Sequence, residues 1–250
     1  MAPNNGKGSL VAQRTLEVLL LFMENNKLTL SEISKALCIS KTATHRILST
    51  LNDMNFLQRD NTKRYMLGPA LIRLGRRVES NVRDVSLPIM KQLSMETGES
   101  VYLSVSYNQM YYFFIEGVES EHPVKWSVRI GEPNTLFAGS AGKAHLAFKN
   151  LKEVKDIINK ASLIAYTNMT ITDKKKILEE IKKIRLEGYS FSKGERYEGT
   201  VGISCPIFDN KTEVAVLSIF LPEYRFKHEQ LTNFISLLKK STEKISSLLI

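Results

Sequence analysis

The sequence contains few of the residues that build disulfide frameworks and metal sites. Only two of its 250 residues are cysteine, Cys38 and Cys205, and four are histidine. Two cysteines so far apart form no disulfide framework, which fits a reducing compartment. No two histidines or cysteines have the spacing of metal ligands. We therefore expect neither a metal site nor a cofactor.

The chain also lacks a long apolar run and a signal sequence. No segment approaches the ~18 consecutive apolar residues that cross a bilayer. The first residues show no charged, apolar and cleavable pattern. These absences argue against a membrane-spanning protein and predict a cytoplasmic protein with no membrane partner.

Motifs for catalysis are missing as well. Residues 139–144 read Gly-Ser-Ala-Gly-Lys-Ala and superficially match a phosphate-binding loop. Phe137 stands where that loop needs its first glycine, and Ala144 replaces the hydroxyl that binds magnesium. No motif assembles a nucleophile, a base and an orienting group. The sequence therefore predicts a protein without catalytic residues.

The most informative part of the chain is the segment from residue 28 to 67. One helix begins there at Thr29, whose hydroxyl can form a capping box with Glu32. A three-residue turn then ends at Ser40, which can cap a further helix starting near Lys41. The pattern predicts a helix-turn-helix.

The helix after the turn has two opposed faces. Its packing stripe is Thr44, Ile47, Leu48 and Leu51. Its polar stripe is Thr42, His45, Arg46 and Ser49. Those polar side chains can hydrogen-bond to base edges or phosphates, as a helix in a major groove does. Taken alone, the same pattern also fits an ordinary amphipathic surface helix.

A basic hairpin follows and strengthens the DNA-binding interpretation. Residues 56–59 and 63–67 are predicted to pair as strands around Asp60-Asn61-Thr62. The cations at or beside the tip are Arg59, Lys63 and Arg64. The arrangement predicts a winged helix-turn-helix whose tip lies against phosphates or in a minor groove.

These residues also resemble a known family. The run Ser40-Lys41-Thr42-Ala43-Thr44-His45-Arg46-Ile47-Leu48, followed by Phe56-Leu57, Arg64-Tyr65 and Leu67-Gly68, resembles the IclR-type transcriptional regulators of bacteria and archaea. Ala43 departs from the threonine that is common in that family. Together with the polar stripe, the resemblance implies contacts to a double-stranded DNA operator from Ser40, Lys41, Thr42, Ala43, His45, Arg46, Ser49, Arg59, Lys63 and Arg64.

Charge and length indicate how the chain is divided. Residues 1–80 hold 12 Lys and Arg against 6 Asp and Glu, a net charge of +6, whereas residues 81–250 hold 23 against 20, a net charge of +3. Clustered positive charge favours nucleic acid. A winged helix needs only about 60 to 80 residues, so a second domain is expected. The expected parts are a disordered start (1–9), a winged helix-turn-helix (10–68), a linker helix (69–81) and a second domain (82–250).

The second domain is predicted to be α+β, with an antiparallel sheet flanked by helices. Helices are expected at 82–97, 141–149, 151–159, 173–187 (capped by Thr172) and 227–249. Strands are expected at 100–106, 110–117, 124–130, 201–208 and 213–220. We expect a left-handed helix end at both Gly98 and Gly188.

The resemblance extends through this domain. Gly131, residues 136–144, Gly188-Tyr189, Glu195, residues 199–202, 204–209 and 216–219 resemble the ligand-domain motifs of IclR-type regulators. These domains are GAF-like sheets with a cavity. The resemblance implies an effector-binding pocket made by Ala138, Ser140, Ala141, Glu195, Cys205, Ser218 and Phe220. Phe220 and Leu221 depart from the usual small residues, which implies a smaller or more apolar cavity.

The residues themselves agree with a ligand site but leave alternatives. Small residues at 139–142 and the amide groups of a helix start favour an anion such as a carboxylate. Tight packing without a ligand fits them equally well. Glu195 either accepts backbone hydrogen bonds in the pocket or lies on the surface beside Arg196. Cys205 either lines the cavity or packs within a strand.

We therefore expect a prokaryotic, ligand-responsive DNA-binding regulator, and a repressor more than an activator. It would sense a small organic effector such as a carboxylic acid, and bind a pseudo-palindromic operator as a homodimer or a dimer of dimers. Two alternatives remain open from sequence. One is an architectural DNA-binding protein without a ligand, and the other is an enzyme tethered to a winged helix.

Overall fold

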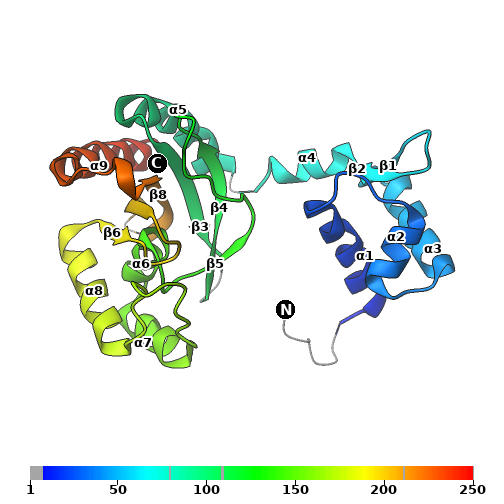
Figure 1. Cartoon of the computed structure of the whole chain (residues 1–250), viewed down its shortest axis with the longest axis horizontal. Helices are drawn as coiled ribbons and strands as arrows, with labels where there is room; N and C mark the ends of the chain where they lie inside the picture. Colours follow the sequence, from blue (N-terminus) through cyan, green and yellow to red (C-terminus); the bar gives the residue numbers. More distant parts are fainter. Residues whose placement is uncertain (1–7, 79, 108–109, 211, 250) are drawn as a thin grey trace. The chain divides into compact units, whose positions relative to one another are not determined.

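The computed structural model describes residues 8–78, 80–107, 110–210 and 212–249 (Figure 1). These residues form two compact units, Met1–Val78 and Glu79–Ile250. Most of the expected disordered start lies outside the described residues. Ser9, which was expected within it, instead caps the first helix by accepting a hydrogen bond from the Ala12 amide.

The N-terminal unit is a winged helix-turn-helix. Its elements are α1 (Leu10–Leu20), a 3₁₀ turn η1 (Leu21–Met23), α2 (Leu30–Leu37), α3 (Lys41–Asp53), β1 (Leu57–Arg59), β2 (Tyr65–Leu67) and α4 (Pro69–Gly75). The predicted capping box of Thr29 and Glu32 is confirmed. Ser40 caps α3 by accepting the Ala43 amide at 3.2 Å. Local hydrogen bonds thus set where α2 and α3 begin.

A small core holds this unit together. The buried residues are Val18, Phe22, Ile33, Leu48, Leu51, Leu57 and Tyr65. They come from every element between α1 and β2, so the hairpin packs on the same core as the helices. Tyr65 also bridges to Leu28 ahead of α2, with backbone hydrogen bonds of 2.7 and 3.0 Å. The position of the wing relative to α3 is therefore determined by burial.

The prediction of a single linker helix over residues 69–81 is wrong. α4 ends at Gly75, and a separate helix α5 (Ser80–Thr97) begins the C-terminal unit. After Gly75 the chain closes tight turns, in which the Arg77 amide bonds to the Leu74 carbonyl and the Val78 amide to the Gly75 carbonyl. Such turns end a helix instead of extending it.

The C-terminal unit contains a six-stranded antiparallel sheet with the strand order β5-β4-β3-β8-β7-β6. Its strands are β3 (Ser100–Ser106), β4 (Tyr111–Val118), β5 (Pro133–Thr135), β6 (Ser190–Lys193), β7 (Thr200–Asp209) and β8 (Thr212–Pro222). Besides α5, its helices are α6 (Ser140–Ala147), α7 (Leu151–Lys160), α8 (Lys174–Glu187) and α9 (Leu231–Leu248). This is the predicted α+β class.

The sheet is covered on both faces (Figure 1). One core joins α5 and α9 to alternate residues of β3, β7 and β8, among them Leu103, Ile203 and Leu217. A second core lies between the other face and α6, α7 and α8, and it includes Tyr102 and Phe220. Because side chains alternate along a strand, Val216 and Phe220 of β8 belong to the second core, whereas Leu217 and Ile219 belong to the first.

Several expected boundaries of the C-terminal unit are corrected. Residues 124–130 form no strand, because the Tyr102 hydroxyl donates to the Trp126 carbonyl and accepts the Val128 amide, both at 3.3 Å. The strand of this region is β5 instead. Asp173, not Thr172, caps α8 by accepting the Lys176 amide at 2.9 Å.

Strand β6 was not predicted. Near the C-terminal end of the chain, a 3₁₀ turn (His228–Gln230) precedes α9, which begins at Leu231 instead of residue 227. The left-handed helix ends predicted at Gly98 and Gly188 are confirmed by φ angles of 73° and 75°. No described helix has the length and apolar character needed to cross a membrane.

Candidate functional site

Helix α3 has the two opposed faces that the sequence predicted. Thr44 and Leu48 are fully buried and Leu51 is nearly so. The polar stripe of Thr42, His45, Arg46 and Ser49 is exposed, as are Lys41 and Ala43. Ser40 is exposed too and is occupied as the cap of the helix. The N-terminal end of α3 therefore presents a polar surface without apolar cover.

The hairpin tip is organised by Asp60. Its carboxylate accepts hydrogen bonds from the Thr62 hydroxyl at 2.6 Å and the Arg64 amide at 3.0 Å. It also pairs with Lys27 at 2.9 Å. These contacts, with the Thr62 hydroxyl first, hold the pKa of Asp60 well below its usual range. Because Lys63 adopts a left-handed conformation with φ 63°, the turn depends on this local network.

The three cations of the hairpin differ in their surroundings. Arg59 and Lys63 are exposed, and the Arg59 guanidinium lies 5.4 Å from the centre of the Tyr65 ring. Arg64 is engaged within its own unit, because its guanidinium lies 3.5 Å from Glu32 and 3.4 Å from the Lys27 carbonyl. Contact between Arg64 and a phosphate would compete with these bonds.

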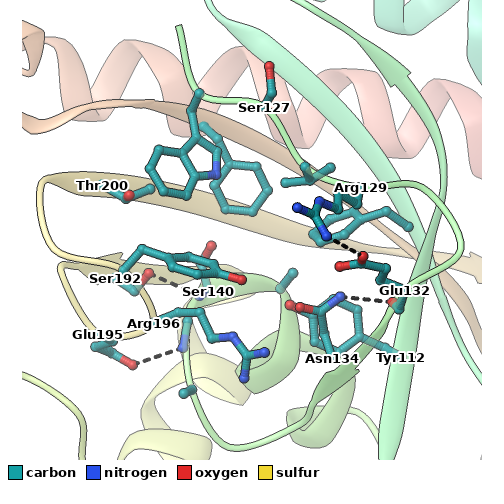
Figure 2. Close-up of a pocket in the computed structure, with 18 residues that line it drawn as sticks. Tyr112, Ser127, Arg129, Glu132, Asn134, Ser140, Ser192, Glu195, Arg196 and Thr200 are labelled. Carbon is teal, nitrogen blue, oxygen red and sulfur yellow. Dashed lines mark hydrogen bonds and ion pairs between the residues drawn. The ribbon is translucent and has the colours of Figure 1, made fainter. Parts of the chain in front are cut away.

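The C-terminal unit holds a cavity of about 390 Å³ between the sheet and the start of α6 (Figure 2). Five of the seven predicted effector-binding residues line it: Ala138, Ser140, Ala141, Glu195 and Phe220. The cavity has aromatic walls, made by Tyr112, Phe114, Trp126, Tyr197 and Phe220. Its polar lining includes Arg129, Glu132, Asn134, Ser192, Arg196 and Thr200. This size and mixture of groups suit a small ligand.

The prediction that Cys205 lines the cavity is not met by the structure. Cys205 lies in the core beneath α5 and α9, on the opposite face of β7 from Ser204. Burial raises the pKa of its thiol to about 12. Ser218 does not line the cavity either. It lies one hydrogen bond behind it, 2.8 Å from Ser204, whose hydroxyl donates to Ser140 at 2.8 Å.

Of the two roles expected for Glu195, the structure shows a buried carboxylate that accepts a backbone hydrogen bond at the cavity. Glu195 is only 8% exposed, and its carboxylate accepts the Gly139 amide at 3.2 Å. Its other oxygen lies 2.6 Å from the ammonium of Lys143, a side chain that is almost completely buried. Lys143 also donates to Glu180 at 3.0 Å and to the Phe191 carbonyl at 3.2 Å. Glu195 therefore ties the loop after β6 to the first turn of α6.

A second buried network was not found from the sequence. His145 on α6 lies 2.9 Å from the Ser104 hydroxyl and 2.9 Å from the Glu213 carboxylate. The three groups resemble a hydrolase triad in order, but Ser104 and His145 are 0% exposed. The Ser104 hydroxyl also donates to the Val216 carbonyl. Because a substrate cannot reach these buried groups, they do not form a catalytic triad. Their hydrogen bonds instead join α6 to β3 and β8.

The cavity residues that sequence reasoning missed come from two distant segments. Trp126, Asn134 and Tyr112 precede α6, whereas Arg196 and Thr200 follow β6. No local motif links them. Arg196 immediately follows Glu195, and the alternation of Gly202 and Ser204 with apolar residues could have identified the cavity face of β7. Among the described residues, no group of histidines, cysteines and carboxylates is arranged to hold a metal ion.

Comparison with known proteins assigns both units. Residues 11–61 match the IclR helix-turn-helix domain, and residues 77–247 match the C-terminal domain of the bacterial transcriptional regulator IclR. The chain belongs to the IclR family of transcriptional regulators. The resemblance seen in the sequence is thus confirmed.

Individual IclR-type proteins are similar over nearly the whole chain. The HTH-type transcriptional regulator KipR of Bacillus subtilis is 32% identical over 237 residues, covering 93% of this chain and 94% of the relative. The regulator KdgR of Escherichia coli is 29% identical, covering 90% and 86%. The crystal structure of the Thermotoga maritima IclR protein is 30% identical, with a TM-score of 0.83 over 95% of this chain and 98% of that one.

Membership of the IclR family has direct consequences. Its members are transcriptional regulators with a DNA-binding helix-turn-helix and an effector-binding C-terminal domain. The family is not enzymatic, so the alternative of a tethered enzyme is excluded. In this chain the exposed face of α3 and the cavity beside α6 lie in the units that match these two domains.

Proposed function

We propose that this protein is a ligand-responsive repressor that acts on operator DNA in the cytoplasm of a prokaryote. The observation that carries the proposal is the cavity at the start of α6, in a chain whose other unit is a winged helix. A regulator without a ligand would have no need of a cavity with polar groups among aromatic walls.

The proposed DNA contacts come from α3 and the hairpin. In this arrangement α3 lies in a major groove, where Thr42, His45 and Arg46 meet base edges or phosphates. The proposed contacts around them are Ser40, Lys41, Ala43, Ser49, Arg59, Lys63 and Arg64. The exposure of the polar stripe supports this role, and so does the excess of positive charge in residues 1–80.

The proposed response to a ligand is a population shift. We expect a homodimer or a dimer of dimers on a pseudo-palindromic operator, with two copies of α3 reading two half-sites. A small organic effector that binds one dimer arrangement more tightly changes the spacing of these helices. The shift in DNA affinity is limited by the difference between the effector's affinities for the two arrangements.

Gel-shift titration tests the DNA-binding part. Affinity for intergenic DNA upstream of the gene is expected to fall with salt, and each lost phosphate contact lowers the slope of log affinity against log salt by about 0.9. Arg46→Ala is expected to weaken specific binding. Lys160→Ala removes an exposed cation of the C-terminal unit and serves as the matched control. Equal binding to unrelated DNA would instead favour an architectural protein.

Thermal unfolding tests the ligand response. A panel of organic acids is added to the full-length protein, and a ligand at a hundred times its dissociation constant is expected to stabilise it by about 2.7 kcal/mol. The same ligand is then added to the operator complex, from which it should release the protein if the regulator is a repressor. A flat response to a broad panel would remove the support for sensing.

A further inference from the structure

The charged groups lining the cavity are neutralised within the protein, with one exception. Arg129 pairs with Glu132 at 3.0 Å, and Glu195 pairs with the buried Lys143 at 2.6 Å. Arg196 pairs with no carboxylate among the described residues. Its guanidinium donates to the Thr135 hydroxyl at 3.1 Å, and its buried Nε atom has no hydrogen-bond partner in the described part of the chain.

The guanidinium of Arg196 is held in place by aromatic rings. It lies 4.0 Å from the centre of the Tyr166 ring and 5.7 Å from that of Tyr197. The Tyr166 hydroxyl is in turn 3.1 Å from the Thr135 hydroxyl that Arg196 contacts. Figure 2 shows Arg196 and Arg129 entering the cavity from different walls. Arg196 is therefore a positioned cation that lacks an anion.

The start of α6 is less available to a ligand anion than the sequence implied. The Gly139 amide donates to Glu195 at 3.2 Å, and the Ser140 amide donates to the Ser192 hydroxyl at 3.0 Å (Figure 2). Glu195 thus provides, from within the chain, the negative charge that a helix N-terminus favours. A ligand anion would meet a carboxylate there, whereas at Arg196 it would meet an unpaired cation.

The walls of the cavity favour a flat ligand. The rings of Phe114 and Phe220 lie 5.8 Å apart, and those of Trp126 and Tyr197 lie 5.2 Å apart. The Phe220 ring depends on Gly202, since a Cβ atom at that position would lie 2.7 Å from it. In addition, Thr200 is about nine-tenths buried at the cavity and its hydroxyl has no partner among the described residues.

We propose that Arg196 is the specificity-determining residue of the cavity and binds the anionic group of a planar, aromatic or conjugated acid. The planar guanidinium forms two parallel hydrogen bonds with a carboxylate. The ligand's ring lies against the aromatic walls, and a polar substituent reaches the Thr200 hydroxyl. This inference rests on the proposed ligand response and names the class of ligand and the residue that selects it.

Trp126 provides the readout, because it lines the cavity and is the single tryptophan of the chain. Fluorescence titration of the full-length protein is carried out with benzoate, cinnamate and 2-naphthoate, and with benzamide and acetate for comparison. At least one planar acid is expected to give a saturable change. Benzamide lacks the charge and acetate lacks the ring, so each is expected to bind at least about tenfold more weakly.

Two variants separate a specific role of Arg196 from a general effect of positive charge. Arg196→Gln is expected to weaken binding of the planar acid at least about tenfold while binding of benzamide stays unchanged, which also shows that the cavity is folded. Arg129→Gln removes a cation that Glu132 already neutralises, and is expected to weaken binding less than about threefold.

The inference is overturned if no planar acid gives a saturable change, if benzamide binds as tightly as the acids, or if the two arginine variants behave alike. Its failure can be distinguished from failure of the proposed function. A neutral ligand that alters Trp126 emission and releases DNA would refute the role of Arg196 and preserve ligand response. A planar acid that binds through Arg196 without any effect on DNA affinity would support the role of Arg196 and refute the proposed ligand response.

Discussion

Replacing Lys143 by methionine tests how the start of α6 is held. All three N–H groups of the ammonium are used, toward Glu195, Glu180 and the Phe191 carbonyl, at 2.6, 3.0 and 3.2 Å. Methionine fills a similar volume but leaves the Glu195 carboxylate buried, with the Gly139 amide as its remaining hydrogen-bond partner among the described residues. Breaking a buried pair from one side costs about 3–5 kcal/mol. We expect about 3 kcal/mol, because the Gly139 bond remains.

The double variant makes this prediction specific to charge. Lys143→Met combined with Glu195→Gln leaves no buried ion at this point, and Glu180, whose side chain is 26% exposed, can turn to water. The double variant is therefore expected to be more stable than Lys143→Met alone by about 1–2 kcal/mol. Lys160→Met, at an exposed position, serves as the control and is expected to change stability by less than about 0.5 kcal/mol.

Urea unfolding followed by Trp126 emission is the assay, because the single tryptophan reports on the C-terminal unit of the full-length chain. The reasoning is refuted if Lys143→Met costs less than about 1 kcal/mol, or if the effects of the two substitutions simply add. Either result would mean that the Lys143 ammonium does not neutralise a buried Glu195.

Two further predictions concern packing and thiol reactivity. Gly202→Ala is expected to destabilise the C-terminal unit by about 1–3 kcal/mol, because the new methyl group meets the Phe220 ring and the Ser140 hydroxyl. Adding Phe220→Ala should recover part of that loss in the same urea assay, and strict additivity would contradict the clash. With a thiol-specific reagent at pH 8, exposed Cys38 is expected to react and Cys205 to react only after unfolding, since burial raises the pKa of its thiol to about 12. Modification of both cysteines in the native protein would contradict this.

Local interactions explain why the winged helix could be predicted closely. The capping box of Thr29 and Glu32 and the Ser40 cap join residues three positions apart. The two stripes of α3 follow from helical periodicity alone. The prediction of one linker helix was wrong because the chain leaves the helix after Gly75, a glycine that the prediction did not treat as a helix end.

The cavity could be predicted only in part. Five of its residues were found through family resemblance, but Cys205 was assigned to the wrong face of its strand. A single-residue error moves a side chain across the sheet, so motif matching without strand register is not enough. The third expected strand failed for another reason, because a side-chain hydroxyl of Tyr102 satisfies the backbone there instead of a neighbouring strand.

The sequence by itself determined the class of this protein, the helix caps and opposed faces of its winged helix, and the concentration of positive charge in its first third. These properties arise from residues close together in the chain. Only the tertiary structure decided which groups meet in the cavity. Lys143 and Glu195 are 52 positions apart, and Arg196 and Thr135 are 61 apart. Which charges are paired depends on distances across the folded unit, and no local pattern encodes them.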